Sequence, residues 1–279
     1  MGFTYCHQAR PSNSWINIVL AYLAPCCILS GYSGQVSILV LDRAARKRST
    51  LSGYLVTAPN LIGHGSRVAT DYRLSSFAED LRPYLAARNY SLIIGHSLGA
   101  LTTLALFSHL SPSHPTAIVL VDPPMQVAAE SIPFFNSIFS DSCVNVKPAD
   151  AHGVENLLWT REDSIYRELG TRLCSVEGVN ALFQVRLSVV RTVLVQVDTL
   201  QQNKPWSFSD YLNAISKKWK VTALVADPAF YKICPVEDIH PYPHVRPVMV
   251  SGAGHWIQYE FPEVIVDEAL KTVAELEIA

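Results

Sequence analysis

The sequence predicts an α/β fold, with a mainly parallel, twisted sheet that carries helices on both faces. Short apolar runs of β type alternate with helical stretches from residue 27 to residue 123, and the same alternation returns after about residue 219. This alternation is typical of parallel strands joined by crossover helices. The 279 residues are 49% apolar, which is enough for one large core. We therefore expect one domain spanning residues 1–279.

The expected strands are short apolar segments that each end in a turn. They are Cys26–Leu29, Tyr54–Ala58, Ser91–Ile94, Ala117–Val121, Val221–Ala226 and Val245–Val250. Runs of this length bounded by turn residues fit buried strands better than helices.

Three helices are expected between or after these strands. Ser76-Phe77-Ala78-Glu79 resembles a capping box, which predicts a helix that Pro83 kinks. A stretch of small and apolar residues from 99 to 110 predicts a buried helix. Pro262 is suited to the first position of a final helix. One face of the first helix carries Phe77, Leu81, Tyr84 and Leu85. The predicted inward stripe of the last helix consists of Val266, Leu270 and Val273.

Residues from about 125 to 215 interrupt the alternation. Apolar residues recur there at helical spacing without clear strands, which predicts a helical cap inserted into the α/β domain. Its large apolar side chains suggest an apolar ligand, although core packing explains each one equally well. They include Phe134, Phe135, Trp159 and Phe183.

Charge and cysteine content limit the partners and the compartment. The formal net charge is −2 and no block of five or more like charges occurs, so nucleic acid is not an expected partner. The six cysteines are thinly spread, which favours reduced thiols and a cytoplasmic location. The apolar run Trp15–Leu29 is too short to span a bilayer, so stable membrane insertion is not expected. A secretory leader is the alternative interpretation of this run.

Gly95-His96-Ser97-Leu98-Gly99 carries the strongest chemical signal. This G-x-S-x-G sequence follows an apolar strand and precedes a helix. Glycines two residues before and after a serine permit a tight strand-to-helix turn that raises the hydroxyl above the sheet edge. We therefore expect Ser97 to be a nucleophile, with backbone N–H groups of the helix terminus stabilising a developing oxyanion.

A serine nucleophile needs a histidine base and an acid that orients it. His255 follows the strand Val245–Val250 through the small-residue loop Gly252-Ala253-Gly254, so it is the expected base. Asp227 directly follows the strand Val221–Ala226 and is the favoured acid. Asp122 and Asp238 remain alternatives.

These residues resemble those of the α/β-hydrolase superfamily, specifically its capped esterases and lipases. Ser30-Gly31-Tyr32-Ser33-Gly34 stands where that family has its oxyanion loop, and Asn60 to Ser66 resembles its Asp-x-x-Gly-x-Gly-x-Ser turn. The resemblance implies that the backbone N–H groups of Tyr32 and Leu98 form the oxyanion hole. Ser30 and Asn60 depart from the usual histidine and aspartate of the family. Family members that act on epoxides or haloalkanes have an aspartate where Ser97 stands.

The expected activity is hydrolysis of a carboxylic ester, or a related acyl or lactone substrate, through an acyl-enzyme. No cofactor is expected. Pro241 and Pro243 keep His240 and His244 from sharing a helix face, so no metal is expected either. An acyltransferase, a C–C hydrolase and a non-catalytic binding protein remain alternatives, because one fold and one triad serve all of them.

Overall fold

A computed structural model describes the chain over residues 17–20, 39–42, 59, 61–65, 67–87, 89–127, 129–183, 206–230 and 233–278. The expected strands Cys26–Leu29 and Tyr54–Ala58 lie outside the described residues. So do Tyr32 and most of the segment Trp15–Leu29.

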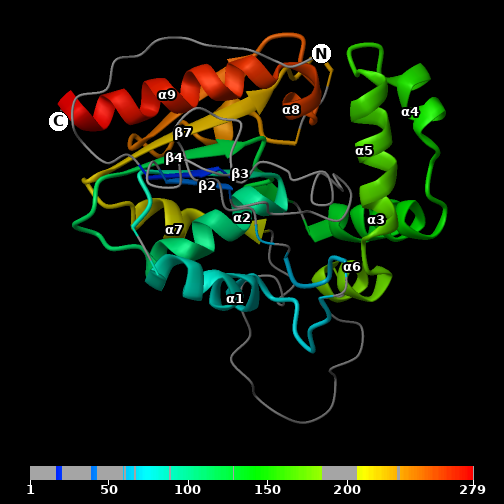
Figure 1. Cartoon of the computed structure of the whole chain (residues 1–279), viewed down its shortest axis with the longest axis horizontal. Helices are drawn as coiled ribbons and strands as arrows, with labels where there is room; N and C mark the ends of the chain where they lie inside the picture. Colours follow the sequence, from blue (N-terminus) through cyan, green and yellow to red (C-terminus); the bar gives the residue numbers. More distant parts are fainter. Residues whose placement is uncertain are drawn as a thin grey trace.

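A six-stranded sheet forms the centre of the fold (Figure 1). Its strand order is β2-β1-β3-β4-β7-β8, and every neighbouring pair is parallel except β1 with β2. The predicted mainly parallel sheet is therefore confirmed, and the last four strands lie where the sequence placed them. The strands are β1 (Asn17–Leu20), β2 (Leu39–Asp42), β3 (Leu92–His96), β4 (Thr116–Val121), β7 (Trp219–Ala226) and β8 (Val245–Val250).

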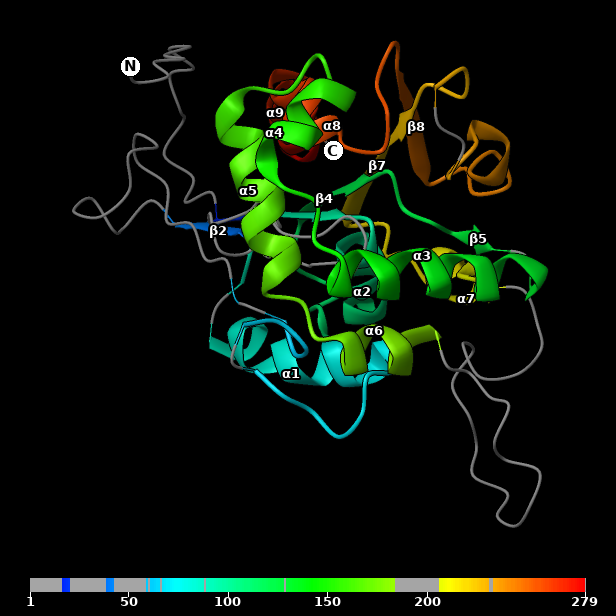
Figure 2. The same ribbon diagram turned by 90° about the vertical axis from the view of Figure 1, so that its right-hand side faces the viewer.

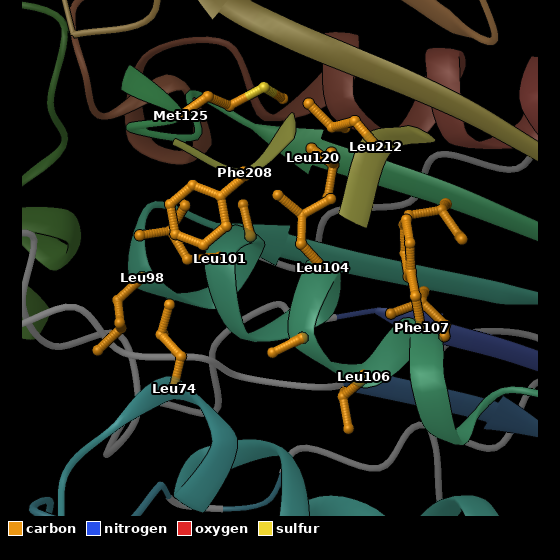
Figure 3. Close-up of a cluster of buried hydrophobic side chains, with 14 of the residues drawn as sticks. Leu74, Leu98, Leu101, Leu104, Leu106, Phe107, Leu120, Met125, Phe208 and Leu212 are labelled. Atoms are coloured by element: carbon orange, nitrogen blue, oxygen red, sulfur yellow. The ribbon is translucent and has the colours of Figure 1, made fainter. Parts of the chain in front are cut away.

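Alternate residues of the central strands feed two separate apolar cores. Ile93, Leu120 and Val225 pack on one face, whereas Ile94 and Val121 pack on the other. Because side chains alternate along a strand, a sheet that is apolar on both sides must be covered by helices on both sides. Figure 3 shows the larger core, where residues of α2 meet Leu74, Leu120 and Phe208.

Helices cover both faces of the sheet. The first face carries α1 (Leu74–Ala87), α2 (Leu98–Ala105) and α7 (Ser209–Asn213), and the second carries α9 (Pro262–Ile278). The predicted capping box is wrong, because Ser76 lies inside α1 and its hydroxyl donates to Asp71.

The predicted buried face of α9 is also wrong, because two of its three residues point to solvent. Val266 and Leu270 are 52% and 42% exposed, whereas Ile265 and Ala269 are buried together with Val273. The predicted opening of this helix at Pro262 is confirmed.

Between β4 and β7 the described residues form four further helices. Figures 1 and 2 show them gathered at one end of the sheet. The backbone of Gly63 and Gly65, both at positive φ, bonds to Ser175 and Leu173, which joins this helical segment to the turn before α1. The helices are α3 (Ile132–Val144), α4 (Ala149–Glu155), α5 (Arg161–Arg172) and α6 (Val176–Phe183), flanked by the short strands β5 (Gln126–Val127) and β6 (Trp206–Ser207).

Candidate active site

Ser97 occupies a tight turn between β3 and α2. Its φ of 53° and ψ of −121° lie in a region that residues with a side chain rarely adopt. The Ser97 N–H donates to the Val121 carbonyl over 2.9 Å, which holds the turn against β4. A Cβ on Gly95 would lie 2.4 Å from the Gly99 carbonyl oxygen, so the turn requires glycine there.

His255 lies between Ser97 and a carboxylate. Its Nε2 is 3.1 Å from Ser97 Oγ, and its Nδ1 is 2.5 Å from Asp122 Oδ2. The side chain of His255 is 5% exposed and that of Asp122 is 0% exposed. Because the carboxylate can only accept, Nδ1 carries the proton and Nε2 presents its lone pair to the serine hydroxyl.

Asp122, rather than Asp227, is the acid that contacts His255. Asp122 directly follows β4 with a φ of 40°, and its second carboxylate oxygen accepts the Ala226 N–H over 3.1 Å. The preference for Asp227 is therefore corrected to Asp122, one of the two alternatives. Both aspartates end parallel strands at the same sheet edge, and only Asp122 turns its carboxylate toward the imidazole.

Asp227 instead binds the loop that carries His255. Its Oδ2 accepts the Gly252 N–H over 2.8 Å, and its own N–H donates to the Ala253 carbonyl over 2.9 Å. These bonds, with a further one from the Ala229 N–H, lower the pKa of Asp227. Asp238 lies in the 3-10 helix Val236–Asp238.

Leu98 is the first residue of α2, directly after the serine. An N–H in the first turn of a helix has no acceptor within the helix, and the helix dipole adds partial positive charge there. The Leu98 N–H is therefore placed at the terminus where an oxyanion hole is expected. Tyr32, the other expected donor, lies outside the described residues.

Several residues around His255 carried no recognisable sequence signal. Glu260 Oε2 accepts the Gly254 N–H over 2.5 Å, and Glu260 Oε1 lies 3.4 Å from Trp159 Nε1. The Arg167 guanidinium lies over the Trp256 ring, 4.6 Å from its centroid. Trp159 and Arg167 belong to the segment between β4 and β7. This segment therefore packs against residues 252–260, which we call the histidine loop. No local motif reveals such contacts, because the partners are about 90 to 100 residues apart.

The sequence matches the profile of a protein family over most of its length. Residues 29–268 match the sequence profile described as the Alpha/beta hydrolase family, and the chain belongs to this family. No curated protein matches the sequence.

Solved structures share the fold at low sequence identity. The chain is similar to an E-2-(acetamidomethylene)succinate hydrolase (14% identity, TM-score 0.60, covering 94% of this chain and 100% of that one). It also resembles a thermophilic esterase from Thermogutta terrifontis (18% identity, TM-score 0.54, covering 85% of this chain and 86% of that one). A third similar structure is an epoxide hydrolase from Bacillus megaterium (13% identity, TM-score 0.52, covering 83% of this chain and 87% of that one). These likenesses support the α/β-hydrolase fold.

Two features are absent from the described residues. None of their helices is both long and apolar enough to cross a membrane. They also contain no cluster of three or more histidine, cysteine, aspartate or glutamate side chains arranged to hold a metal ion.

Proposed function

We propose that this hydrolase cleaves carboxylic esters, or related acyl and lactone substrates, through an acyl-enzyme on Ser97. The observation that carries the proposal is the buried chain of Ser97, His255 and Asp122, joined by distances of 3.1 and 2.5 Å. A serine hydroxyl becomes a nucleophile only when a base takes its proton. His255 supplies this base, and Asp122 is the acid that orients it.

In the proposed reaction, Ser97 Oγ attacks the acyl carbon while His255 Nε2 takes the hydroxyl proton. Asp122 stabilises the imidazolium that forms, and the Leu98 N–H stabilises the oxyanion together with the Tyr32 N–H that the family resemblance implies. His255 then returns the proton to the leaving alcohol. A water molecule, deprotonated by the same histidine, then attacks the acyl carbon. The bond from this carbon to Ser97 Oγ breaks, the histidine returns the proton to Oγ, and the acid leaves.

The proposed substrate is a small molecule with an apolar acyl or alcohol group. We assign the segment from about 125 to 215 as a cap within one domain over residues 1–279. Contacts of this segment with the histidine loop support the assignment: Trp159 packs edge-on against Trp256 and Tyr259, with ring centroids 5.9 and 4.8 Å apart. Aromatic rings beside a catalytic base offer apolar surface to a substrate.

We also propose a reducing, cytoplasmic location. Cys143, Cys174 and Cys234 are not joined in disulfides, and burial together with the charge of Asp122 raises the pKa of Cys234. Thiols of this kind react slowly and suit a compartment that keeps them reduced.

Hydrolysis of p-nitrophenyl esters from acetate to palmitate tests the proposed activity, with Ser97→Ala and His255→Ala measured alongside. Turnover that disappears in both variants, and labelling of Ser97 by a fluorophosphonate, are the expected results. The acyl chain length that is hydrolysed fastest then indicates the size of the acyl-binding site. Folded wild-type protein that neither turns over these esters nor labels at Ser97 would refute the proposal and favour a binding protein. Labelling without ester turnover would exclude simple esters and direct the search to acyl transfer or C–C cleavage.

A further inference from the structure

His96, the residue before the serine, is bound to the histidine base. Its Nε2 donates to the backbone carbonyl of His255 over 2.8 Å, across 159 positions of sequence. The two imidazole rings lie 4.6 Å apart between centroids, and His96 is 6% exposed. This contact is a buried, direct hydrogen bond to the residue on which the proposed chemistry depends.

Two adjacent residues, the last of β3 and the first of the turn that follows it, therefore bind two parts of one histidine. Ser97 Oγ meets the His255 ring at Nε2, and His96 Nε2 meets the His255 backbone. Since neighbouring residues in a tight turn move together, this pair of contacts fixes the distance between the serine hydroxyl and the imidazole. Small displacements of a base from its hydroxyl are costly in rate.

The His255 carbonyl can only accept, so the hydrogen of His96 is on Nε2, and the contact with Gln258 is compatible with this tautomer. The side-chain amide nitrogen of Gln258 lies 3.3 Å from His96 Nδ1, which accepts from it. Burial lowers the pKa of His96 well below its ordinary value, and the nearby charges of His255 and Arg167 lower it further. The neutral ring thus donates to His255 without adding a positive charge beside it.

We propose that His96 is a positioning residue, which holds His255 at the distance that proton transfer from Ser97 requires. The inference rests on the proposed function, because it assumes that His255 is the base. His96 itself neither accepts nor releases a proton in the reaction.

His96→Gln and His96→Asn form a matched pair of tests. Glutamine carries an amide nitrogen at about the reach of Nε2 and can still donate to the His255 carbonyl, whereas the shorter asparagine places its amide near Nδ1. We expect His96→Asn to lower kcat by about tenfold or more with little change in KM, because the base is misplaced after substrate binds. His96→Gln is expected to retain kcat within about threefold. The acid limb of the kcat/KM profile should not move in His96→Gln, since His96 does not titrate there.

The same measurements can overturn the proposal. Equal kcat values for folded His96→Asn and wild-type protein would remove the positioning role, and so would a His96→Gln variant as impaired as His96→Asn. A shifted acid limb in His96→Gln would show that His96 itself titrates in the reaction. Wild-type protein without Ser97-dependent turnover or labelling would instead refute the proposed function, so the two failures are distinguishable. Thermal melting of each variant establishes that it is folded.

Discussion

Replacing Asp122 with asparagine is expected to remove most of the activity without changing the shape of the site. The carboxylate accepts from two donors, His255 Nδ1 at 2.5 Å and the Ala226 N–H at 3.1 Å. An asparagine amide has one oxygen and can satisfy only one of them. If the oxygen faces Ala226, the amide nitrogen faces Nδ1 and forces the proton onto Nε2, where it blocks transfer from Ser97. If the oxygen faces Nδ1, two donors oppose each other at a fully buried position.

We expect Asp122→Asn to lower kcat by roughly 10³ to 10⁴, the order seen when a triad acid is replaced. That loss corresponds to about 4 to 5 kcal/mol of transition-state stabilisation. Asp227→Asn is the matched control, because Asp227 has the same chemistry but binds the Gly252 N–H and the Ala229 N–H. It keeps one acceptor, so a loss below about tenfold is expected.

The assay is steady-state hydrolysis of the best p-nitrophenyl ester, with active-site titration by a fluorophosphonate to count functional sites. Thermal melts establish that each variant is folded. An Asp122→Asn variant within tenfold of wild type would refute the assignment of Asp122. A loss in Asp227→Asn as large as that in Asp122→Asn would show that the backbone contacts of the histidine loop, rather than the tautomer of His255, limit the rate.

Three further changes test the fold. Gly95→Ala places a methyl group 2.4 Å from the Gly99 carbonyl oxygen and should lower the free energy of unfolding by about 3 kcal/mol or more in urea titrations. Thr160→Ala removes the cap of α5 and should cost about 1 kcal/mol in the same measurement. Burial lowers the pKa of His152 to about 4, so its neutral form stabilises the fold fully above pH 6.5. This contribution falls by at most about 1.4 kcal/mol per pH unit between pH 6.5 and 4, and His152→Gln should remove that fall from urea titrations.

Each of these has a control or a contrary outcome. Gly153→Ala is the control for Gly95→Ala, because its new methyl group meets only a side-chain oxygen at 3.5 Å; equal losses in both would contradict the packing argument. For Thr160, retention of the full unfolding free energy by the alanine variant would show that the cap contributes nothing. If wild type and His152→Gln lose stability in parallel below pH 6.5, other groups control that pH range.

The last four strands and the tight turn at Ser97 could be predicted because each depends on local pattern. The runs before Ser97 and before His255 are apolar, short and followed by small residues, so they identify strand ends whatever the remote packing. The acid could not be chosen in this way. Asp122 and Asp227 each follow an apolar parallel strand, and each precedes a proline. Only the tertiary direction of the two side chains separates them.

The errors in the helices have a similar physical origin. Val264, Ile265 and Val266 are consecutive, so apolar residues occur on more than one face of α9 and its buried side cannot be read from spacing. The capping box at Ser76 failed because α1 begins earlier, at Leu74. His96 contacts His255 across 159 positions, and Glu260 contacts Gly254 outside any recognised motif. The sequence alone therefore gave no sign of either contact.

The sequence spacing of the three proposed triad residues makes the reactivity of Ser97 a measure of how far folding has progressed. Ser97 follows β3 and lies 158 positions from His255 in the sequence, and Asp122 follows β4 and lies 133 positions from it. His255 itself follows β8. Forming contacts of such long range requires a loss of conformational entropy when distant segments are brought together, which slows their formation. During refolding, the rate at which Ser97 becomes reactive should therefore follow the docking of the C-terminal strand, later than the formation of helical signal.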